Sequence, residues 1–516
     1  MTAVRDPETS TRLSFQGPGE PDHVAADSPR TIRSGQLLRL LTRQLIGYHA
    51  GSAVPAPDAV VALPALENGG QSEDRCIYRL RIADGVLWDG QGARQVTAGD
   101  FVRGLKRVAL PTAAHARQYF TDTIEGMREY CEAYDARFAR QRPNAPDLAQ
   151  FQFSHQIAGV RAVDSQVIEI RLLEPANDFL HILATGVAAA APREYDYYLP
   201  DDPELYRNCP SAGPYRIARG RSGDRVLVLE PNPRWNPDTD PIRRRIPDQI
   251  RVTPGSPGDH PAWPYATVAW DGTDGNPEPL GYGLGPYLAV NLREQARGHP
   301  LGIRAVRRAI AAAIDRSAVR DAVATIPGVR AVVQPGLLPP GSPGYASARP
   351  TAGERGDPDR ARRELAGAGY SEGIALTMRV GESELERQAA AAVRKGLARA
   401  GVVLRPPSRS AEGHWDLALA SHLPDWYGNN GRTAVAPLVR SGSGRSYGYR
   451  NPDVDRLIAS ALREPGPDRA AELWRSVEAL VMDDLPLIPL LAHACGPCLA
   501  AAGAPPRVCW YGERTS

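Results

Sequence analysis

The sequence predicts an α/β protein with more than one domain, and three observations lead to this prediction. Residues 374–404 read as a strand, a helix and a second strand, which is typical of a crossover between parallel strands. Two segments nearer the N-terminus, residues 76–107 and 159–173, contain runs that alternate hydrophobic and charged residues, as half-buried strands do. The chain has 516 residues, which is too long for a single hydrophobic core.

The composition excludes several classes of protein. Hydrophobic residues make up 42% and charged residues 23%, as in ordinary globular proteins. The formal net charge is +2, so no nucleic-acid partner is implied. Six cysteines are too few for a disulfide scaffold in a chain of this length. No zinc-protease, phosphate-loop or Ser/His/Asp motif is present, so we expect no metal, no cofactor and no catalytic residues.

The N-terminal segment, residues 1–30, is polar and acidic and is expected to be a disordered tail. It has no basic start, no apolar run and no lipidation cysteine, so it does not resemble a signal peptide. No later segment reaches the ~18 apolar residues of a membrane span. These features favour a chain that stays in the cytoplasm, or one that has lost an export signal.

The segment Cys76–Arg107 predicts a strand, a turn and a helix. Tyr78 and Leu80 fall on one face of the strand, and arginines fall on the other. Thr97, with Asp100 three residues later, is typical of a capping box at the start of a helix.

This segment resembles, nearly position for position, the signature YTFxLRxGVxWxDGxPVTAxDVVxSxxR of the family 5 solute-binding proteins, the peptide and nickel receptors of ABC importers. Four later stretches are similar to other family patterns, and the similarity runs from about Leu37 to the C-terminus with a gap at 253–286. These stretches are SAGPY (211–215), GIRAVRRAIAAAIDR (302–316), YGYRNPDVD (447–455) and DLPLIPL (484–490).

The resemblance implies a periplasmic-binding-protein-like fold, with two α/β lobes, a ligand cleft and two hinge crossings. By this resemblance lobe I combines residues 31–60, 177–252 and 487–516, an extra lobe spans 61–176, and lobe II spans 253–486. The glycines and prolines between Gly272 and Pro286 predict a loop rather than a regular element. Trp270, just before them, is a candidate wall of the ligand site.

Residues 415–430, WDLALASHLPDWYGNN, predict a strand that ends before Pro424 and continues into a loop. They resemble the family pattern YDLALxGWxADYxDP, whose loop Asp pairs with the α-ammonium of a bound peptide. The resemblance therefore implies that Asp425 binds the ligand. The alternative is that Asp425 is a helix N-cap or an ordinary turn residue.

Other candidate ligand-binding residues are aromatic. Trp415, Trp426 and Tyr427 surround Asp425 in sequence and are expected to line apolar side-chain pockets. Tyr48 follows a segment that resembles the floor of the family's ligand cleft, and the alternative is that Tyr48 belongs to the hydrophobic core. One of three downstream arginines is expected to meet a ligand carboxylate, and the sequence does not choose among Arg432, Arg440 and Arg445.

The function predicted from these features is capture of a peptide or peptide-like molecule by a monomeric solute-binding protein that works with ABC permease subunits. The family resemblance implies an extracytoplasmic, membrane-associated location. The alternative is a cytoplasmic derivative of this fold that sequesters, senses or processes a metabolite. A third hypothesis is thiol redox chemistry at Cys495 and Cys498, which form the CGPC motif of thioredoxins but have no helix predicted after them.

Overall fold

The computed structural model divides the chain into two compact units. The first comprises residues 1–272 and 497–513, and the second comprises residues 273–496 and 514–516. The structure describes residues 12–17, 38–49, 52–90, 92, 94–200, 202–218, 227–243, 245, 248–254, 266–268, 281–293, 299–326, 329–346, 354–381, 384–407, 415–494, 498–499 and 508–509.

The first unit contains the predicted strand–turn–helix segment. Strand β4 (Ile77–Arg81) buries Tyr78 and Leu80 and exposes the arginines between and after them, so the predicted alternation is confirmed. It pairs antiparallel with β6 (Val167–Arg171), which also pairs with β5 (Val160–Ala162). Helix α2 (Ala98–Lys106) then begins with the expected capping box, in which the Asp100 carboxylate accepts the backbone N–H of Thr97 at 2.9 Å.

The remaining helices of this unit are short. The segment that starts at Met127 forms two helices, α4 and α5. The helices are α3 (Ala114–Thr121), α4 (Met127–Phe138), α5 (Ala145–Ser154), α6 (Phe179–Leu183), α7 (Pro203–Asn208) and the 3-10 turns η1 (Arg107–Ala109), η2 (Pro111–Ala113), η3 (Gly186–Ala188), η4 (Arg193–Tyr197) and η5 (Pro237–Thr239).

A five-stranded sheet in this unit has the order β10-β1-β9-β8-β7. Strand β1 (Arg12–Gly17) lies within the tail expected to be disordered, and it pairs parallel to β9 and β10, so that expectation is wrong for these six residues. Leu13 and Phe15 alternate with polar residues here, a short strand pattern inside an otherwise polar segment. The other strands are β7 (Tyr215–Ile217), β8 (Leu227–Pro231), β9 (Gln249–Pro254) and β10 (Ala266–Val268).

A buried ionic cluster lies in the first unit beside the hairpin formed by β2 (Ile46–Tyr48) and β3 (Pro55–Pro57). Arg43 Nε and Arg243 Nη2 each donate to the Asp58 carboxylate at 2.6 Å. Burial alone would raise the pKa of Asp58, but Arg243 and Arg43 outweigh it and lower this pKa to about 2. Asp58 is therefore ionised, and it links segments that lie far apart in the sequence.

The second unit is built on a seven-stranded mixed sheet. Its path is β12-β17-β11-β15-β13-β14, and β16 also pairs with β11. The predicted crossover is confirmed, because β13 (Ile374–Val380) and β14 (Val402–Arg405) pair in parallel and α11 (Glu384–Arg399) joins them. The other strands are β11 (Tyr282–Val290), β12 (Ala331–Val333), β15 (Leu417–His422), β16 (Leu487–Pro489) and β17 (Leu491–Ala494).

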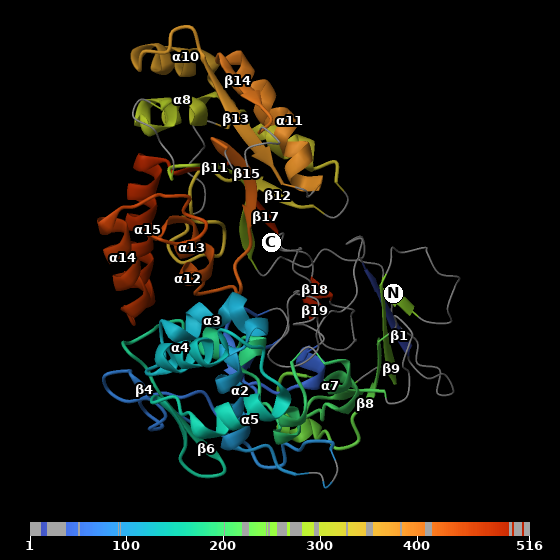
Figure 1. Ribbon diagram of the computed structural model, residues 1–516. Helices are drawn as coiled ribbons and strands as arrows, with labels where there is room; N and C mark the ends of the chain where they lie inside the picture. The colour runs from blue at the N-terminus through green and yellow to red at the C-terminus, as the bar shows by residue number, and fades with distance from the viewer. Residues whose placement is uncertain are drawn as a thin grey trace. The chain divides into compact units, whose positions relative to one another are not determined.

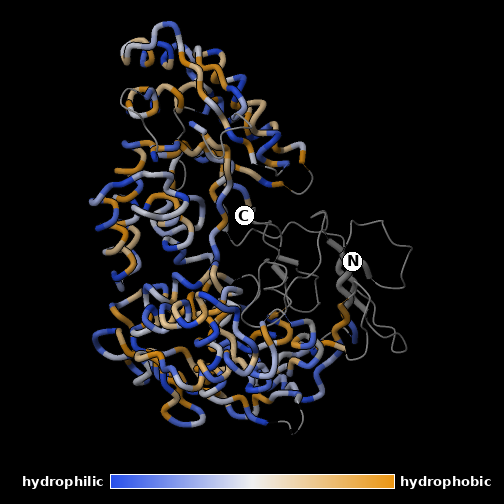
Figure 2. The backbone as a smooth tube through the Cα atoms, viewed as in Figure 1, coloured by the Kyte–Doolittle hydropathy of each residue, from blue (hydrophilic) through white to orange (hydrophobic). Residues whose placement is uncertain are grey.

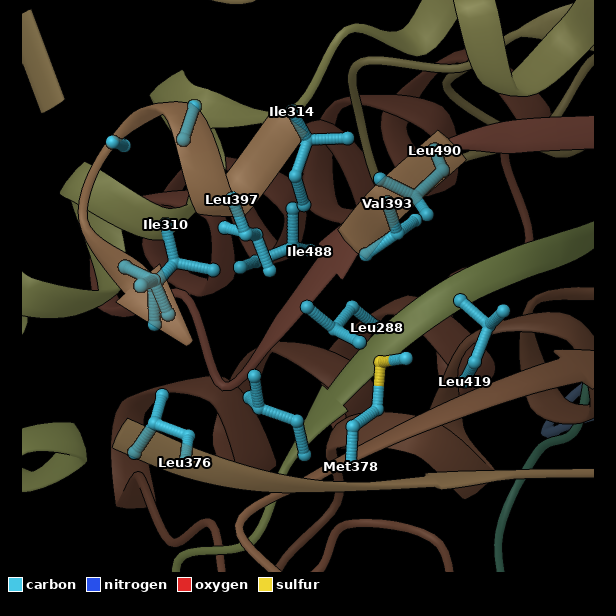
Figure 3. Packing of buried hydrophobic residues seen from close by; sticks show 14 of the residues in the cluster. Leu288, Ile310, Ile314, Leu376, Met378, Val393, Leu397, Leu419, Ile488 and Leu490 are labelled. Carbon is cyan, nitrogen blue, oxygen red and sulfur yellow. The ribbon is translucent and has the colours of Figure 1, made fainter. Parts of the chain in front are cut away.

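Helices cover both faces of this sheet. One hydrophobic cluster joins Leu288, Leu419 and Ile488 of the sheet to the helices α8–α11 (Figure 3). A second cluster joins Tyr287 and Ala418 to α12–α15, and α14 and α15 lie side by side in Figure 1. The helices are α8 (Arg304–Ala313), α9 (Arg316–Val323), α10 (Pro358–Gly367), α12 (Gly431–Ala434), α13 (Ala436–Val439), α14 (Pro452–Arg463), α15 (Pro467–Asp484) and the 3-10 turn η6 (Pro300–Gly302).

The helical pattern of the sequence is visible in this arrangement. Figure 2 shows hydrophobic and hydrophilic residues alternating along α14 and α15, as expected for helices with one buried face. In α8, Val306 and Ile310 lie four residues apart on one face of the helix, and both are buried. Arg307, which the helical pattern places towards solvent, is buried instead, because its guanidinium donates to the carbonyl oxygens of Leu301 and Asp484.

Strand β11 corrects the prediction that the glycine-rich stretch up to Pro286 is only a loop. Its first residues, from Tyr282, are a strand, and they pair with β15 and β17. The glycines permit close packing: a Cβ on Gly283 would lie 2.7 Å from the carbonyl oxygen of His422, and one on Gly285 would lie 2.7 Å from Ser421 Cβ. These glycines therefore mark a close approach of β11 to the end of β15. Residues 269–280 lie outside the described part of the chain.

Strands β16 and β17 both pair with β11 and lie in the second compact unit. In the first unit, β18 (Cys498–Leu499) pairs with β19 (Val508–Cys509), and Cys498 lies opposite Cys509. Cys498 therefore starts a strand, not the helix that a thioredoxin-type thiol requires, and Cys495 lies outside the described residues.

Candidate functional site

The candidate site lies at the carboxyl end of β15. This strand is central in its sheet, antiparallel to β11 on one side and parallel to β13 on the other. Leu417 and Leu419 face one hydrophobic cluster and Ala418 faces the other, so the strand is buried on both faces. Packing on both faces thereby fixes the end of β15 and the start of the turn that follows it.

A compact turn follows the strand and carries Asp425. The indole N–H of Trp426 donates to the carbonyl oxygen of Asn429 at 2.8 Å, and Gly428 adopts a φ of +83°. The N-cap of the next helix, α12, is Asn430, so the N-cap alternative for Asp425 is wrong. Asp425 lies in a bend and is half-buried, between Pro424 and Trp426, which are both buried.

The aromatic residues expected beside Asp425 are placed differently from one another. Trp426 and Tyr427 are buried in the turn, and the Tyr427 ring packs so closely on Gly281 that a Cβ there would lie 2.3 Å away. Trp415 lies at the opposite end of β15, and six residues at ~3.3 Å each separate the two ends by roughly 20 Å. The structure therefore brings Trp426 and Tyr427 to Asp425 but does not bring Trp415 there.

Trp415 is packed within the second unit. The guanidinium of Arg379 lies 4.9 Å from the centre of its ring, and Tyr447 meets it edge-on at 4.9 Å. Trp270, the other tryptophan expected at the site, lies outside the described residues.

Tyr48 belongs to the first unit and ends strand β2. It is half-exposed, so it is not a fully buried core residue. Its hydroxyl group lies 2.8 Å from Nδ1 of His181, and the Arg39 guanidinium lies 5.6 Å from the centre of its ring. Burial lowers the pKa of His181 to about 4, against the opposing effect of Asp178, so the imidazole is neutral at pH 7.

Sequence reasoning could not choose among the three arginines downstream, but the structure distinguishes them. Arg440 is exposed, whereas Arg432 and Arg445 are half-buried. Arg445 reaches the end of β15, where its Nη1 lies 3.2 Å from Nδ1 of His422. These two residues are 23 positions apart, and nothing in the local sequence pattern indicates that they meet.

Among the described residues, no group of histidine, cysteine, aspartate or glutamate side chains is arranged to hold a metal ion. Likewise, none of the helices described here combines the length and hydrophobicity that crossing a membrane requires.

Comparison with known proteins identifies the family. The sequence model of the bacterial extracellular solute-binding proteins, family 5 Middle, matches residues 60–434, which include β15 and Asp425. This match covers most of the chain, and the chain therefore belongs to the family 5 bacterial extracellular solute-binding proteins. It is accordingly a solute-binding protein with the fold of that family, as the sequence predicts.

The individual relatives are distant. The glutathione-binding protein GsiB of Escherichia coli O1:K1 / APEC is 24% identical over 390 residues, covering 70% of this chain and 73% of GsiB. GsiB of Salmonella paratyphi A is 25% identical over 383 residues, covering 68% of this chain and 72% of that protein.

Solved structures agree on the fold. Clavulanic acid biosynthesis oligopeptide binding protein 2 superposes with a TM-score of 0.71 at 24% identity, covering 95% of this chain and 91% of that chain. The Escherichia coli murein tripeptide binding protein MppA gives a TM-score of 0.68 at 19% identity and covers 97% of both chains.

Proposed function

We propose that this protein captures a short peptide or peptide-like molecule for an ABC-type importer, and that Asp425 binds the ammonium group of this ligand. The family match over residues 60–434 is the observation that carries the proposal. The names of the relatives support the ligand class, since they describe binding of glutathione, an oligopeptide and a murein tripeptide.

The position of Asp425 suits this role chemically. Open α/β sheets bind ligands beyond the carboxyl ends of their strands, and Asp425 follows the carboxyl end of β15 by three residues. Its half-buried carboxylate is flanked by buried Pro424 and Trp426. An ammonium group bound there is partly shielded from water, which strengthens its attraction to the carboxylate.

The protein would act as a binding protein without catalysis. Its partners would be the peptide and the permease subunits of the importer, and it would work as a monomer outside the cytoplasm at the membrane surface. The comparisons give no support to the alternative, a cytoplasmic derivative that processes a metabolite.

Isothermal calorimetry with trialanine tests the proposal. Replacing one partner of a buried ion pair costs roughly 3–5 kcal/mol, and a half-buried pair costs less, so Asp425→Asn is expected to weaken binding at least about tenfold. N-acetyl-trialanine, which lacks the ammonium group, is expected to bind as weakly to the unaltered protein as trialanine does to the variant.

Asp321→Asn is the matched control, because Asp321 has a side chain that is 67% exposed and lies on α9. It should leave the affinity unchanged. If trialanine and reduced glutathione both release no heat with the unaltered protein, the peptide-binding function is overturned. If trialanine binds but Asp425→Asn does not weaken it, the function stands and the assignment of Asp425 is removed.

A further inference from the structure

Two cysteines of the C-terminal segment lie opposite each other in a pair of short strands. Strands β18 and β19 are antiparallel, and their register places Cys498 opposite Cys509 and Leu499 opposite Val508 (Figure 1). Residues directly opposite each other in antiparallel strands have Cα atoms about 4.5–5.5 Å apart. Disulfides have Cα atoms about 4.4–6.8 Å apart, so the backbone register alone brings the two cysteines within bonding range.

This strand pair is too short to be stable through its backbone pairing alone. The register consists of two residue pairs, and a two-stranded hairpin is only marginally stable in water. The residues that connect the strands in sequence include Gly503, Pro505 and Pro506, which are typical of a turn. A covalent bond between the strands restricts the unfolded chain and thereby stabilises such a hairpin.

The cysteines of the first unit that precede this hairpin in sequence are poor alternative partners. Among the described side chains, those of Cys76, Cys131 and Cys209 form no disulfide. Burial raises the pKa of the Cys131 thiol, and burial together with the carboxylates of Asp74 and Glu174 raises the pKa of the Cys76 thiol. The thiolate is the reactive form, so Cys76 and Cys131 react slowly at neutral pH.

The remaining alternative partner of Cys498 is Cys495, the other cysteine of the CGPC motif. In a thioredoxin-type pair the reactive thiolate is stabilised at the N-terminus of a helix. Cys498 begins a strand instead, and the residue opposite it in that strand pair is Cys509. The backbone register therefore favours Cys509 over Cys495.

We propose that Cys498 and Cys509 form an intramolecular disulfide that closes the C-terminal hairpin and leaves Cys495 outside the bond. The inference does not depend on peptide binding. The bond forms by exchange with a small-molecule disulfide, which an oxidising compartment outside the cytoplasm supplies.

The exchange takes two steps. The thiolate of one cysteine attacks a sulfur of the oxidant and displaces one small thiol. The thiolate of the other cysteine then attacks the sulfur of the first and displaces the second small thiol. Two protein thiols are thus oxidised to one disulfide, the oxidant is reduced to two thiols, and these thiols take up the two protons that the cysteines release.

Tryptic mapping without reduction tests the inference, because Arg507 separates the two cysteines. Cleavage after Arg475, Arg507 and Arg514 yields peptide 476–507, which contains both CGPC cysteines, and peptide 508–514, which contains the third. The full chain is first equilibrated with hydroxyethyl disulfide, and the remaining thiols are blocked with N-ethylmaleimide in denaturant before digestion. We expect mass spectrometry to find the two peptides joined to each other, and dithiothreitol to abolish this joined mass.

Variants identify the cysteines that form the bond. Cys498→Ser and Cys509→Ser should each lose the joined mass, and Cys495→Ser should keep it. Cys76→Ser, at a cysteine of the first unit, is the matched control and should also keep it.

Three outcomes would overturn the inference. The first is recovery of peptide 508–514 from the unaltered protein with its cysteine blocked by N-ethylmaleimide. The second is a joined mass that survives in Cys498→Ser but disappears in Cys495→Ser. The third is a dimer on a non-reducing gel that dithiothreitol dissolves, because the joined peptides then come from two different chains.

Discussion

At the scale of single residues, buried charges in this protein are stabilised by groups from distant parts of the chain. Asp58 is held by Arg43, 15 residues away, and by Arg243, 185 residues away. Arg445 is held by His422, 23 residues away. In the first cluster Asp240 is a second carboxylate beside both arginines, so two carboxylates balance two guanidinium groups, which fits a structural role.

The Asp58 cluster predicts a dependence of stability on pH. The pKa of Asp58 is about 2 in the folded protein and 3.8 ordinarily, so its contribution is present above about pH 4 and is lost as the pH falls towards 2. The shift corresponds to about 2 kcal/mol. Urea unfolding at pH 7, 4 and 2.5 should show the free energy of unfolding falling below pH 4.

Asp58→Asn isolates this effect. The substitution leaves two buried guanidinium groups with Asp240 as their one remaining carboxylate, so we expect a loss of roughly 3–5 kcal/mol at pH 7. The deficit of the variant relative to the unaltered protein should shrink at pH 2.5, because the ionised Asp58 then contributes less to the free energy of unfolding of the unaltered protein. Parallel pH profiles for the two proteins would contradict this account.

At the scale of elements, close backbone packing decides where glycine is required. Gly213, in a turn, does not have a positive φ. The reason for glycine is space: a Cβ at this position would lie 2.4 Å from the carbonyl oxygen of Leu40. Gly283 and Gly285 let β11 approach the end of β15 in the same way.

Gly213→Ala is therefore expected to destabilise the protein by about 1–3 kcal/mol, because the backbone at Leu40 must shift to admit a methyl group. Gly367→Ala is the matched control, since a Cβ there meets nothing within 4 Å in helix α10 and alanine favours a helix. Urea unfolding should show a loss for the first and no loss for the second. Equal stability of the two variants would refute the packing argument.

At the scale of the whole molecule, each compact unit has its own buried core. The first unit buries Trp88 and Phe101, and the second packs helices on both faces of its seven-stranded sheet. Asp425, which is proposed to bind the ammonium group of the peptide, belongs to the second unit. Ligand binding to the folded state should therefore be visible as stabilisation of the protein.

Trialanine at 100 times its dissociation constant should raise the free energy of unfolding by about 2.7 kcal/mol and raise the melting midpoint with it. Intrinsic fluorescence during heating measures the shift. N-acetyl-trialanine at the same concentration should give a much smaller shift, because it lacks the ammonium group. Equal shifts with both peptides would show that stabilisation does not depend on the charge proposed to meet Asp425.

The sequence determined the class of fold, the family, the crossover from β13 to β14 and the position of Asp425 after β15, because each rests on local periodicity, turn residues or a contiguous motif. It left open which of the three downstream arginines reaches the end of β15, predicted disorder at β1 and a loop at the glycines of β11, and grouped Trp415 with Asp425. Only the tertiary structure decided these points, since strand pairing, close backbone contact and the His422–Arg445 hydrogen bond join residues that no local pattern connects.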